Sequence, residues 1–276
     1  MSTQALRPRS MLFLPADRPR MAAKIPAIDP DLAVLDLEDA VAAGTKVAAR
    51  AVLRESLADG SVLRSRPVIL VRVNEVDSPW FADDLALVHE LGRLGPVGVV
   101  VPKVERAEDV ARVRDAVPDA PLVVGIESGL GVLEVRSILA AGPDGCYFGA
   151  EDYVVDLGGR RTPGGAEVLY ARSRVVLAAR VSGCFAIDQA VVAVRDDDAF
   201  TGDAAQARDL GYGGKICLHP RQVELAHQLF TPTPAELEHA RRVVAAAAGG
   251  VGVVDGVMVD HVHVRQARAL LDRDPG

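Results

Sequence analysis

The sequence of 276 residues has few cysteines and no excess of positive charge. Its three cysteines, Cys146, Cys184 and Cys217, are scattered and form no Cys-x-x-Cys pair, which excludes a disulfide framework and a structural zinc site of the usual spacing. The 31 lysine and arginine residues are outnumbered by 38 aspartate and glutamate residues, so the net charge is −7. Such a chain has little electrostatic attraction to nucleic acid or to an acidic membrane. We therefore expect no nucleic-acid partner.

Long apolar runs are also missing from the chain. No run approaches the roughly 18 residues that a membrane-spanning helix needs, and the segment from Met1 to Met11 lacks the apolar core of a signal peptide. We expect a cytoplasmic protein that does not bind membranes and keeps its cysteines reduced.

The chain alternates short apolar runs, many of them rich in β-branched residues, with amphipathic segments rich in Ala, Leu, Glu and Arg. This alternation is typical of β-strands followed by α-helices. Eight runs are predicted strands: 11–15, 32–37, 68–73, 98–102, 122–127, 145–149, 185–192 and 215–219. Eight parallel strands covered by helices predict an α/β fold, the TIM (β/α)8 barrel, and an open doubly wound sheet is the competing arrangement.

The chain is longer than the about 250 residues typical of such a barrel. The stretch Thr231-Pro232-Thr233-Pro234 is typical of a linker. We assign residues 1–230 to the barrel and residues 231–276 to a C-terminal extension with a predicted helix over 235–248, a short strand and a last helix. A barrel does not need this extension for closure, so the extension is available as a lid or for packing on a neighbouring subunit.

Polar residues stand at the ends of the predicted strands. In a (β/α)8 barrel the active site forms where the carboxyl ends of the strands meet, so these residues are the candidates for chemistry. They are Asp17, Arg18, Asp36, Glu38, Asp39, Arg72, Asn74, Lys103, Glu127, Glu151, Asp152, Asp188, Lys215 and His219. Carboxylates gathered at one mouth repel each other unless a cation lies between them.

Glu127 and Asp152 are the strongest candidates for metal ligands. Oxygen ligands without paired histidines or cysteines favour a hard divalent ion over zinc. Magnesium takes only one or two protein carboxylates, so these acids predict a Mg²⁺ site with positions open for a substrate, and Mn²⁺ is the alternative ion. The competing interpretation is that each acid caps a helix, where carboxylates are also favoured.

Arg72 ends an otherwise apolar strand. A guanidinium there is partly buried and needs an anionic partner, either Glu38 or the carboxylate of a substrate. A metal beside an arginine suits a 2-oxo acid, whose carboxylate and carbonyl chelate the ion. The same pair can stabilise an enolate.

Three further patterns have structural explanations beside functional ones. The stretch Gly158 to Gly165 is either a mobile loop over the site or a plain linker, since it matches no nucleotide-binding motif. His261 and His263 lie in a β-like tail, where such a pair is more typical of a surface than of a metal site. His219 either contacts a ligand or shapes its loop.

In their order and spacing, the motifs resemble those of the aldolase/citrate lyase family, which includes the citrate lyase beta subunit, malyl-CoA lyase and citramalyl-CoA lyase. The resemblance runs nearly from end to end. It is carried by residues 13–19 (FLPADRP), 35–41 (LDLEDAV), 71–74 (VRVN), 101–105 (VPKVE), 125–128 (GIES), 148–152 (FGAED), 170–174 (YARSR) and 214–220 (GKICLHP). It implies a TIM barrel that assembles as a homotrimer or a multiple of trimers.

The resemblance also implies roles for residues. It makes Glu127 and Asp152 the metal ligands, and Arg72 the substrate arginine with Glu38 as its orienting partner. It makes Asp260, in the motif Met-Val-Asp, an acid/base supplied by a neighbouring subunit. After this motif the family commonly has Ser or Ala and then Pro, whereas this chain has a histidine and a valine.

The implied reaction is the cleavage or formation of a 3-hydroxyacyl-CoA, such as malyl-CoA or citramalyl-CoA, to or from acetyl-CoA and a 2-oxo acid. By their position, Arg18, Lys24 and Lys103 are then candidate contacts for coenzyme A. Three alternatives stay open: the citryl-acyl-carrier-protein lyase subunit of citrate lyase, a malyl-CoA thioester hydrolase, and a non-catalytic protein that binds coenzyme A.

Overall fold

The computed structural model describes residues 6–247 and 249–274. The chain divides into two compact units, and the division falls between Ala226 and His227. The first unit is a barrel, and the second contains helices and a small β-hairpin.

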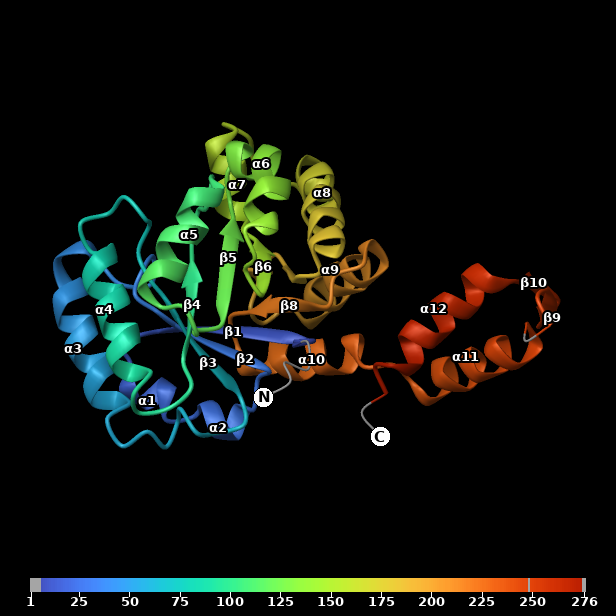
Figure 1. Cartoon of the computed structure of the whole chain (residues 1–276), viewed down its shortest axis with the longest axis horizontal. Coiled ribbons are helices and arrows are strands. Elements are labelled where there is room, and N and C mark those ends of the chain that lie inside the picture. Colours follow the sequence, from blue (N-terminus) through green and yellow to red (C-terminus); the bar gives the residue numbers. More distant parts are fainter. Residues whose placement is uncertain (1–5, 248, 275–276) are drawn as a thin grey trace. The chain divides into compact units, whose positions relative to one another are not determined.

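The first unit is a closed barrel of eight parallel strands (Figure 1). The strands follow one another around the barrel in chain order, and β1 closes the ring by pairing with β8. They are β1 (Ser10–Pro15), β2 (Leu32–Asp36), β3 (Val68–Arg72), β4 (Gly98–Val101), β5 (Leu122–Ile126), β6 (Gly145–Phe148), β7 (Phe185–Asp188) and β8 (Gly214–Cys217). The predicted TIM barrel is confirmed, and the carboxyl ends of its strands form one mouth.

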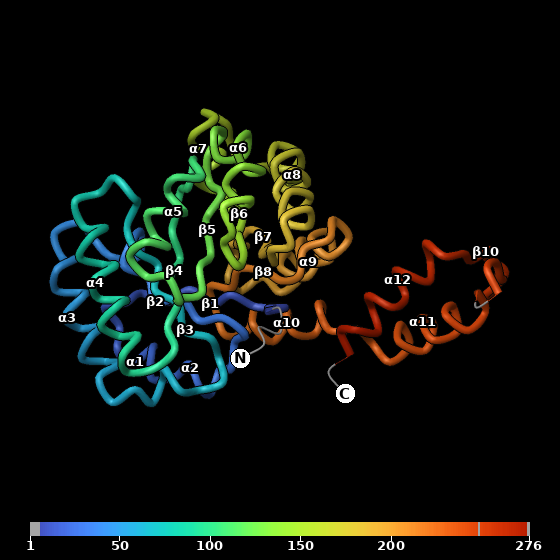
Figure 2. The backbone as a smooth tube through the Cα atoms, in the orientation of Figure 1, coloured from blue at the N-terminus to red at the C-terminus, as the bar shows by residue number. Residues whose placement is uncertain are grey.

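Helices connect the strands and surround the barrel (Figure 2). In the first unit they are α1 (Pro19–Ala22), α2 (Ile25–Ile28), η1 (Ala43–Thr45), α3 (Lys46–Ser56), α4 (Phe81–Leu91), α5 (Ala107–Ala116), α6 (Gly129–Ala140), α7 (Ala150–Asp156), α8 (Ala166–Ser182) and α9 (Asp197–Leu210). The helix α10 (Pro220–Phe230) contains the division between the units. No described helix is long and apolar enough to cross a membrane.

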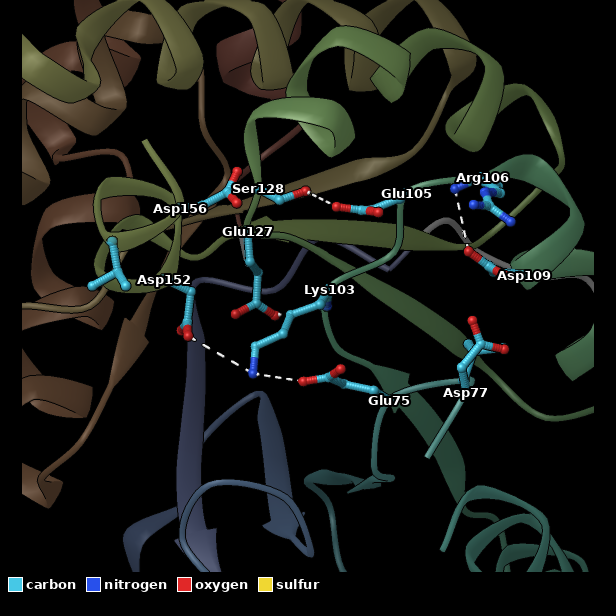
Figure 3. Close-up of a pocket in the computed structure, with 12 residues that line it drawn as sticks. Glu75, Asp77, Lys103, Glu105, Arg106, Asp109, Glu127, Ser128, Asp152 and Asp156 are labelled. Carbon is cyan, nitrogen blue, oxygen red and sulfur yellow. Dashed lines mark hydrogen bonds and ion pairs between the residues drawn. The ribbon is translucent and has the colours of Figure 1, made fainter. Parts of the chain in front are cut away.

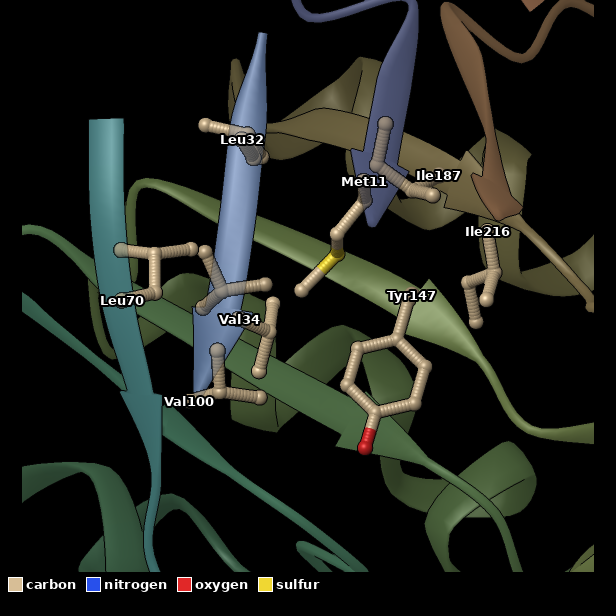
Figure 4. Packing of buried hydrophobic residues seen from close by; sticks show 9 residues of the cluster. Met11, Leu32, Val34, Leu70, Val100, Tyr147, Ile187 and Ile216 are labelled. Carbon is tan, nitrogen blue, oxygen red and sulfur yellow. The ribbon is translucent and has the colours of Figure 1, made fainter. Parts of the chain in front are cut away.

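Apolar side chains from all eight strands fill the interior of the barrel (Figure 4). The buried cluster consists of Met11, Leu32, Val34, Leu70, Val100, Val123, Tyr147, Ile187 and Ile216. Successive side chains of a strand point to opposite faces of the sheet. Asp36, Arg72 and Glu127 follow cluster residues of their own strands by two or four positions. Their side chains therefore also point to the interior, at the mouth of the barrel.

The seventh strand is shorter than predicted. It ends at Asp188, whereas the apolar run suggested a strand as far as Val192. The reason lies in the next residue, because the carbonyl oxygen of Gln189 accepts a hydrogen bond from Nζ of Lys215 at 2.6 Å. The main chain is therefore bound by a side chain just beyond the last ladder pair of β7 and β8, which joins Asp188 to Lys215.

The second unit contains α11 (Pro234–Ala246), the hairpin strands β9 (Gly252–Val254) and β10 (Val257–Val259), and α12 (His261–Leu271). The two helices share an apolar core of Ala240, Val243, Ala247, Val254, Val259 and Ala267. The prediction of a single strand was wrong, since two antiparallel strands are joined by Asp255-Gly256. Both turn residues have positive φ, 52° and 79°, as a two-residue hairpin turn of type I′ requires.

Candidate active site

A pocket of about 380 Å³ lies at the carboxyl ends of β3 to β6 (Figure 3). The segments after β3, β4 and β5, the first turn of α5 and the helix α7 supply its walls. The lining residues are Glu75, Val76, Asp77, Lys103, Glu105, Arg106, Asp109, Glu127, Ser128, Asp152, Val155 and Asp156. Carboxylates dominate this lining, so the pocket favours a cation.

Glu127 stands directly after β5 and is 2% exposed. Its Oε1 accepts hydrogen bonds from the hydroxyl of Tyr147 at 2.5 Å and from the main-chain N–H of Lys103 at 3.2 Å. Two glycines make room for this side chain. A Cβ on Gly125 would lie 2.2 Å from Oε1 of Glu127, and a Cβ on Gly149 would lie 2.6 Å from its Cγ.

Asp152 lies in the first turn of α7 and lines the same pocket. Its side chain is 41% exposed. Burial raises the pKa of Glu127, the guanidinium of Arg72 lowers it, and the charge of Asp152 raises it again. The carboxyl groups of Glu127 and Asp152 therefore interact electrostatically.

This pair of carboxylates fits a magnesium ion. Among the residues that the structure describes, no group of three or more His, Cys, Asp or Glu side chains is placed to hold a metal. Zinc sites usually need such a group, whereas Mg²⁺ binds through one or two carboxylates and keeps several waters. The acidic lining of the pocket thus fits Mg²⁺, and Glu127 and Asp152 stay its predicted ligands.

Arg72 is 8% exposed and is held from both edges. Its Nε and Nη2 donate to the two carboxylate oxygens of Asp36 at 2.7 and 2.6 Å, and its Nη1 lies 2.6 Å from Oε2 of Glu38. The guanidinium also lies 5.2 Å from the ring centre of Phe13. The sequence predicted Glu38 or a substrate as the partner; Glu38 is one partner, and Asp36, which forms the bidentate pair, is a second one.

Glu38 links Arg72 to a second cation. Its Oε1 accepts a hydrogen bond from Nζ of Lys103 at 2.8 Å. Burial raises the pKa of Glu38 to about 7, although Arg72 and the hydrogen bond from Lys103 both lower it. The carboxyl group therefore gains or loses its proton near neutral pH.

The three cations predicted to contact coenzyme A lie in two places. Arg18 and Lys24 are exposed on the segment between β1 and β2, where Arg18 lies 3.3 Å from Asp17. Lys103 lies among the carboxylates of the pocket. A contact with coenzyme A stays a prediction for each of them.

Two other predicted strand-end residues belong to a buried ion network. Nζ of Lys215 lies 2.6 Å from Oδ2 of Asp188, and Arg172 donates to both oxygens of Asp188 at 3.0 and 2.7 Å. These three side chains are fully buried. Lys215 and Arg172 also pair with Asp203. Their charges are satisfied within the protein, and they join β7 and β8 to α8 and α9.

Asp260 belongs to the second unit and caps the N-terminus of α12. Its Oδ1 accepts a hydrogen bond from the main-chain N–H of Val262 at 2.9 Å and lies 2.9 Å from Nδ1 of His263. The hydrogen bond with His263 lowers the pKa of Asp260 most, and the hydrogen bond from Val262 lowers it further. His261 and His263 therefore lie in the first turn of a helix and not in a β-like tail. The role of Asp260 as acid/base stays a prediction.

Sequence reasoning missed the contributions of Asp36 and Tyr147. Asp36 stood among the strand-end residues but received no role, and Tyr147 was assigned only to a strand. The alternation of the strands carried the missing signal, because both residues lie on the interior face, close to the mouth. Polar side chains on the interior face near the mouth are placed to contact Arg72 and Glu127.

Comparison with known proteins identifies the family. Residues 9–220 match the model of the HpcH/HpaI aldolase/citrate lyase family. A citrate lyase subunit beta-like protein of Deinococcus radiodurans is 44% identical over 96% of this chain and 97% of that protein. A (3S)-malyl-CoA thioesterase of Cereibacter sphaeroides is 36% identical over 98% of this chain and 96% of that one. The crystal structure of the protein CitE from Mycobacterium tuberculosis, in complex with magnesium, acetoacetate and coenzyme A, has a TM-score of 0.83 at 31% identity and covers 98% of both chains. The chain belongs to the HpcH/HpaI aldolase/citrate lyase family.

Proposed function

We propose that this chain is a Mg²⁺-dependent lyase that cleaves or forms the carbon–carbon bond of a 3-hydroxyacyl-CoA, such as malyl-CoA or citramalyl-CoA. Cleavage yields acetyl-CoA and a 2-oxo acid. The observation that carries the proposal is the pair of carboxylates, Glu127 and Asp152, beside the buried guanidinium of Arg72. The solved relative that holds magnesium, acetoacetate and coenzyme A supports it.

Glu127 and Asp152 would hold the metal ion. When bound, Mg²⁺ supplies Lewis-acid polarisation of the oxygens of the hydroxy acid or 2-oxo acid. Tyr147 and the main-chain N–H of Lys103 orient Glu127 by binding its Oε1. Both hydrogen bonds restrict the rotation of this carboxylate, which would hold the ion together with that of Asp152.

Arg72 binds the oxo-acid end of the substrate and stabilises the negative charge that develops there as the bond breaks. Asp36 and Glu38 hold its guanidinium from two edges. The group is therefore oriented before the substrate arrives, and less entropy is lost at the moment of reaction.

Proton transfers complete the reaction. A base removes the proton of the substrate hydroxyl as the carbon–carbon bond breaks, and the enolate of acetyl-CoA then takes up a proton at carbon. We assign the second transfer to Asp260 of a neighbouring subunit. In synthesis its carboxylate removes a proton from the methyl group of acetyl-CoA. Arg18, Lys24 and Lys103 are the proposed contacts of coenzyme A.

Two alternatives use the same residues. Attack of water on the thioester would make the chain a malyl-CoA hydrolase, which the 36% identity to a (3S)-malyl-CoA thioesterase favours. Use of an acyl-carrier protein in place of coenzyme A would make it a citryl lyase subunit, which the 44% identity to a citrate lyase subunit beta-like protein favours. A protein that only binds coenzyme A would not need the joint presence of Arg72, Glu127 and Asp152.

We also propose that the chain forms a homo-oligomer. The outer helices α6, α7 and α8 expose large apolar side chains, namely Leu130, Leu133, Val155, Leu169, Tyr170, Leu177 and Val181. Arg174 of α8 donates to the carbonyl oxygen of Leu133 on α6 at 2.6 Å, which joins these two helices. Apolar patches of this kind commonly mark protein interfaces.

Substitution of the metal ligands tests the proposed function. Glu127→Gln and Asp152→Asn each remove one charged ligand, so Mg²⁺-dependent turnover of the thioester should fall about a hundredfold or more, with weaker Mg²⁺ binding in calorimetry. Glu134→Gln, an exposed acid of α6 outside the pocket, is the matched control. Asp260→Asn should lose turnover but keep Mg²⁺ affinity. Wild-type turnover in a folded ligand variant would refute the site.

A further inference from the structure

Lys103 follows β4 and carries its ammonium group into the acidic pocket (Figure 3). Its Nζ donates to Oε1 of Glu38 at 2.8 Å and to Oε1 of Glu75 at 2.9 Å. It also lies 3.8 Å from Oδ1 of Asp152 and 4.0 Å from Oδ1 of Asp39. One ammonium group therefore pairs with four carboxylates from three segments of the barrel mouth.

The main chain of Lys103 adopts an unusual conformation. Its φ is 49°, in the left-handed region that residues other than glycine seldom occupy. With this backbone the residue meets both candidate metal ligands, because its N–H donates to Oε1 of Glu127 while its side chain extends to Asp152. Strained residues of this kind cluster at functional sites.

We propose that Lys103 is an internal counter-cation that competes with Mg²⁺ for the carboxylates of the pocket and so sets how tightly the metal binds. The inference rests on the proposed function, in which Glu127 and Asp152 hold the ion. Carboxylates gathered at one mouth repel each other, and the ammonium offsets this repulsion when the metal is absent. A divalent ion on Asp152 is in turn repelled by the ammonium that lies 3.8 Å from that carboxylate.

The test compares Mg²⁺ binding by calorimetry in five purified proteins: wild type, Lys103→Met, Lys103→Gly, Lys103→Arg and Arg180→Met. Methionine keeps an unbranched side chain without the charge, and arginine keeps the charge. Arg180 is exposed near the end of α8 that leads into β7, so its loss removes one positive charge away from the mouth. Lys103→Gly, which suits the left-handed backbone, is the second uncharged variant.

We expect both uncharged variants of Lys103 to bind Mg²⁺ about tenfold or more tightly than the wild type. Lys103→Arg and Arg180→Met should stay within about twofold of the wild type, because each keeps a cation in the pocket. In EDTA the uncharged variants should unfold at a lower temperature, and saturating Mg²⁺ should raise that temperature by more than in the wild type.

Two failures are distinguishable. Unchanged or weaker Mg²⁺ binding by the uncharged variants, beside measurable binding by the wild type, overturns the role of Lys103 and leaves the proposed function in place. If the uncharged variants lose stability without binding Mg²⁺ more tightly, the role of Lys103 is overturned as well, because the lysine is then purely structural. Absence of Mg²⁺ binding by the folded wild type overturns the proposed function and, with it, the inference.

Discussion

At the scale of the residue, the site brings carboxyl groups and cations together in a largely buried setting. Glu38 shows the balance most clearly, because it contacts both Arg72 and Lys103 and is only 4% exposed. Burial disfavours its charged form, and the two cations favour it. The outcome is a pKa of about 7 in the folded protein, raised from a usual value of 4.5.

This shift gives a prediction for stability against pH. Between these two values the unfolded chain releases the proton of Glu38 and the folded protein retains it, so this group stabilises the fold below about pH 4.5 and the stabilisation is lost as the pH rises through about 7. Glu38→Gln cannot titrate and should not show this loss. Thermal unfolding of both proteins in EDTA, from about pH 5 to about pH 8, measures it. A difference between the proteins that is independent of pH would contradict the assignment.

The alternation of residues along strands explains which site residues the sequence could reveal. Arg72 and Glu127 are charged residues at the ends of apolar runs, and such residues stand out without any knowledge of their neighbours. The pairing of Arg72 with Asp36, and of Glu127 with Tyr147, depends on which strands are adjacent and in what register. The alternation within one strand gives the face on which each residue lies, but these contacts also require the pairing of β2 with β3 and of β5 with β6.

At the scale of the element, eight strands were predicted because each combines apolar residues with a polar end and a following helix. Elements set by long-range contacts were harder to predict. The end of β7 depends on Lys215, which lies more than twenty residues away along the chain. The hairpin of β9 and β10 was missed although it had a local signal. That signal is Asp255-Gly256 between valines, which favours a two-residue turn.

The apolar face of α6, α7 and α8 predicts self-association. Leu177 is 64% exposed on α8, and an aspartate there would place a charge within an apolar contact. Light scattering should therefore give a lower molar mass for Leu177→Asp than for the wild type. Val47→Asp on α3, where Val47 is 68% exposed, is the matched control and should keep the wild-type mass. A wild-type protein that is monomeric at micromolar concentration would contradict the proposed interface.

At the scale of the whole molecule, the barrel supplies the acidic pocket and the buried arginine, and the second unit carries Asp260. The family and the barrel predicted from the sequence are confirmed. The assignment of the extension to a neighbouring subunit stays a prediction, because it concerns contacts between chains. The choice of acyl group also stays open, since it depends on how loops pack around the substrate.

Product analysis tests the lyase chemistry most directly. The purified protein is incubated with malyl-CoA and with citramalyl-CoA, in Mg²⁺ and in EDTA, while the 2-oxo acid is trapped and acetyl-CoA and free CoA are followed. We predict that one or both thioesters release glyoxylate or pyruvate together with an equal amount of acetyl-CoA, and only when the metal is present. Free CoA without a 2-oxo acid, or no cleavage of either thioester by folded protein that binds Mg²⁺, would contradict the proposed lyase.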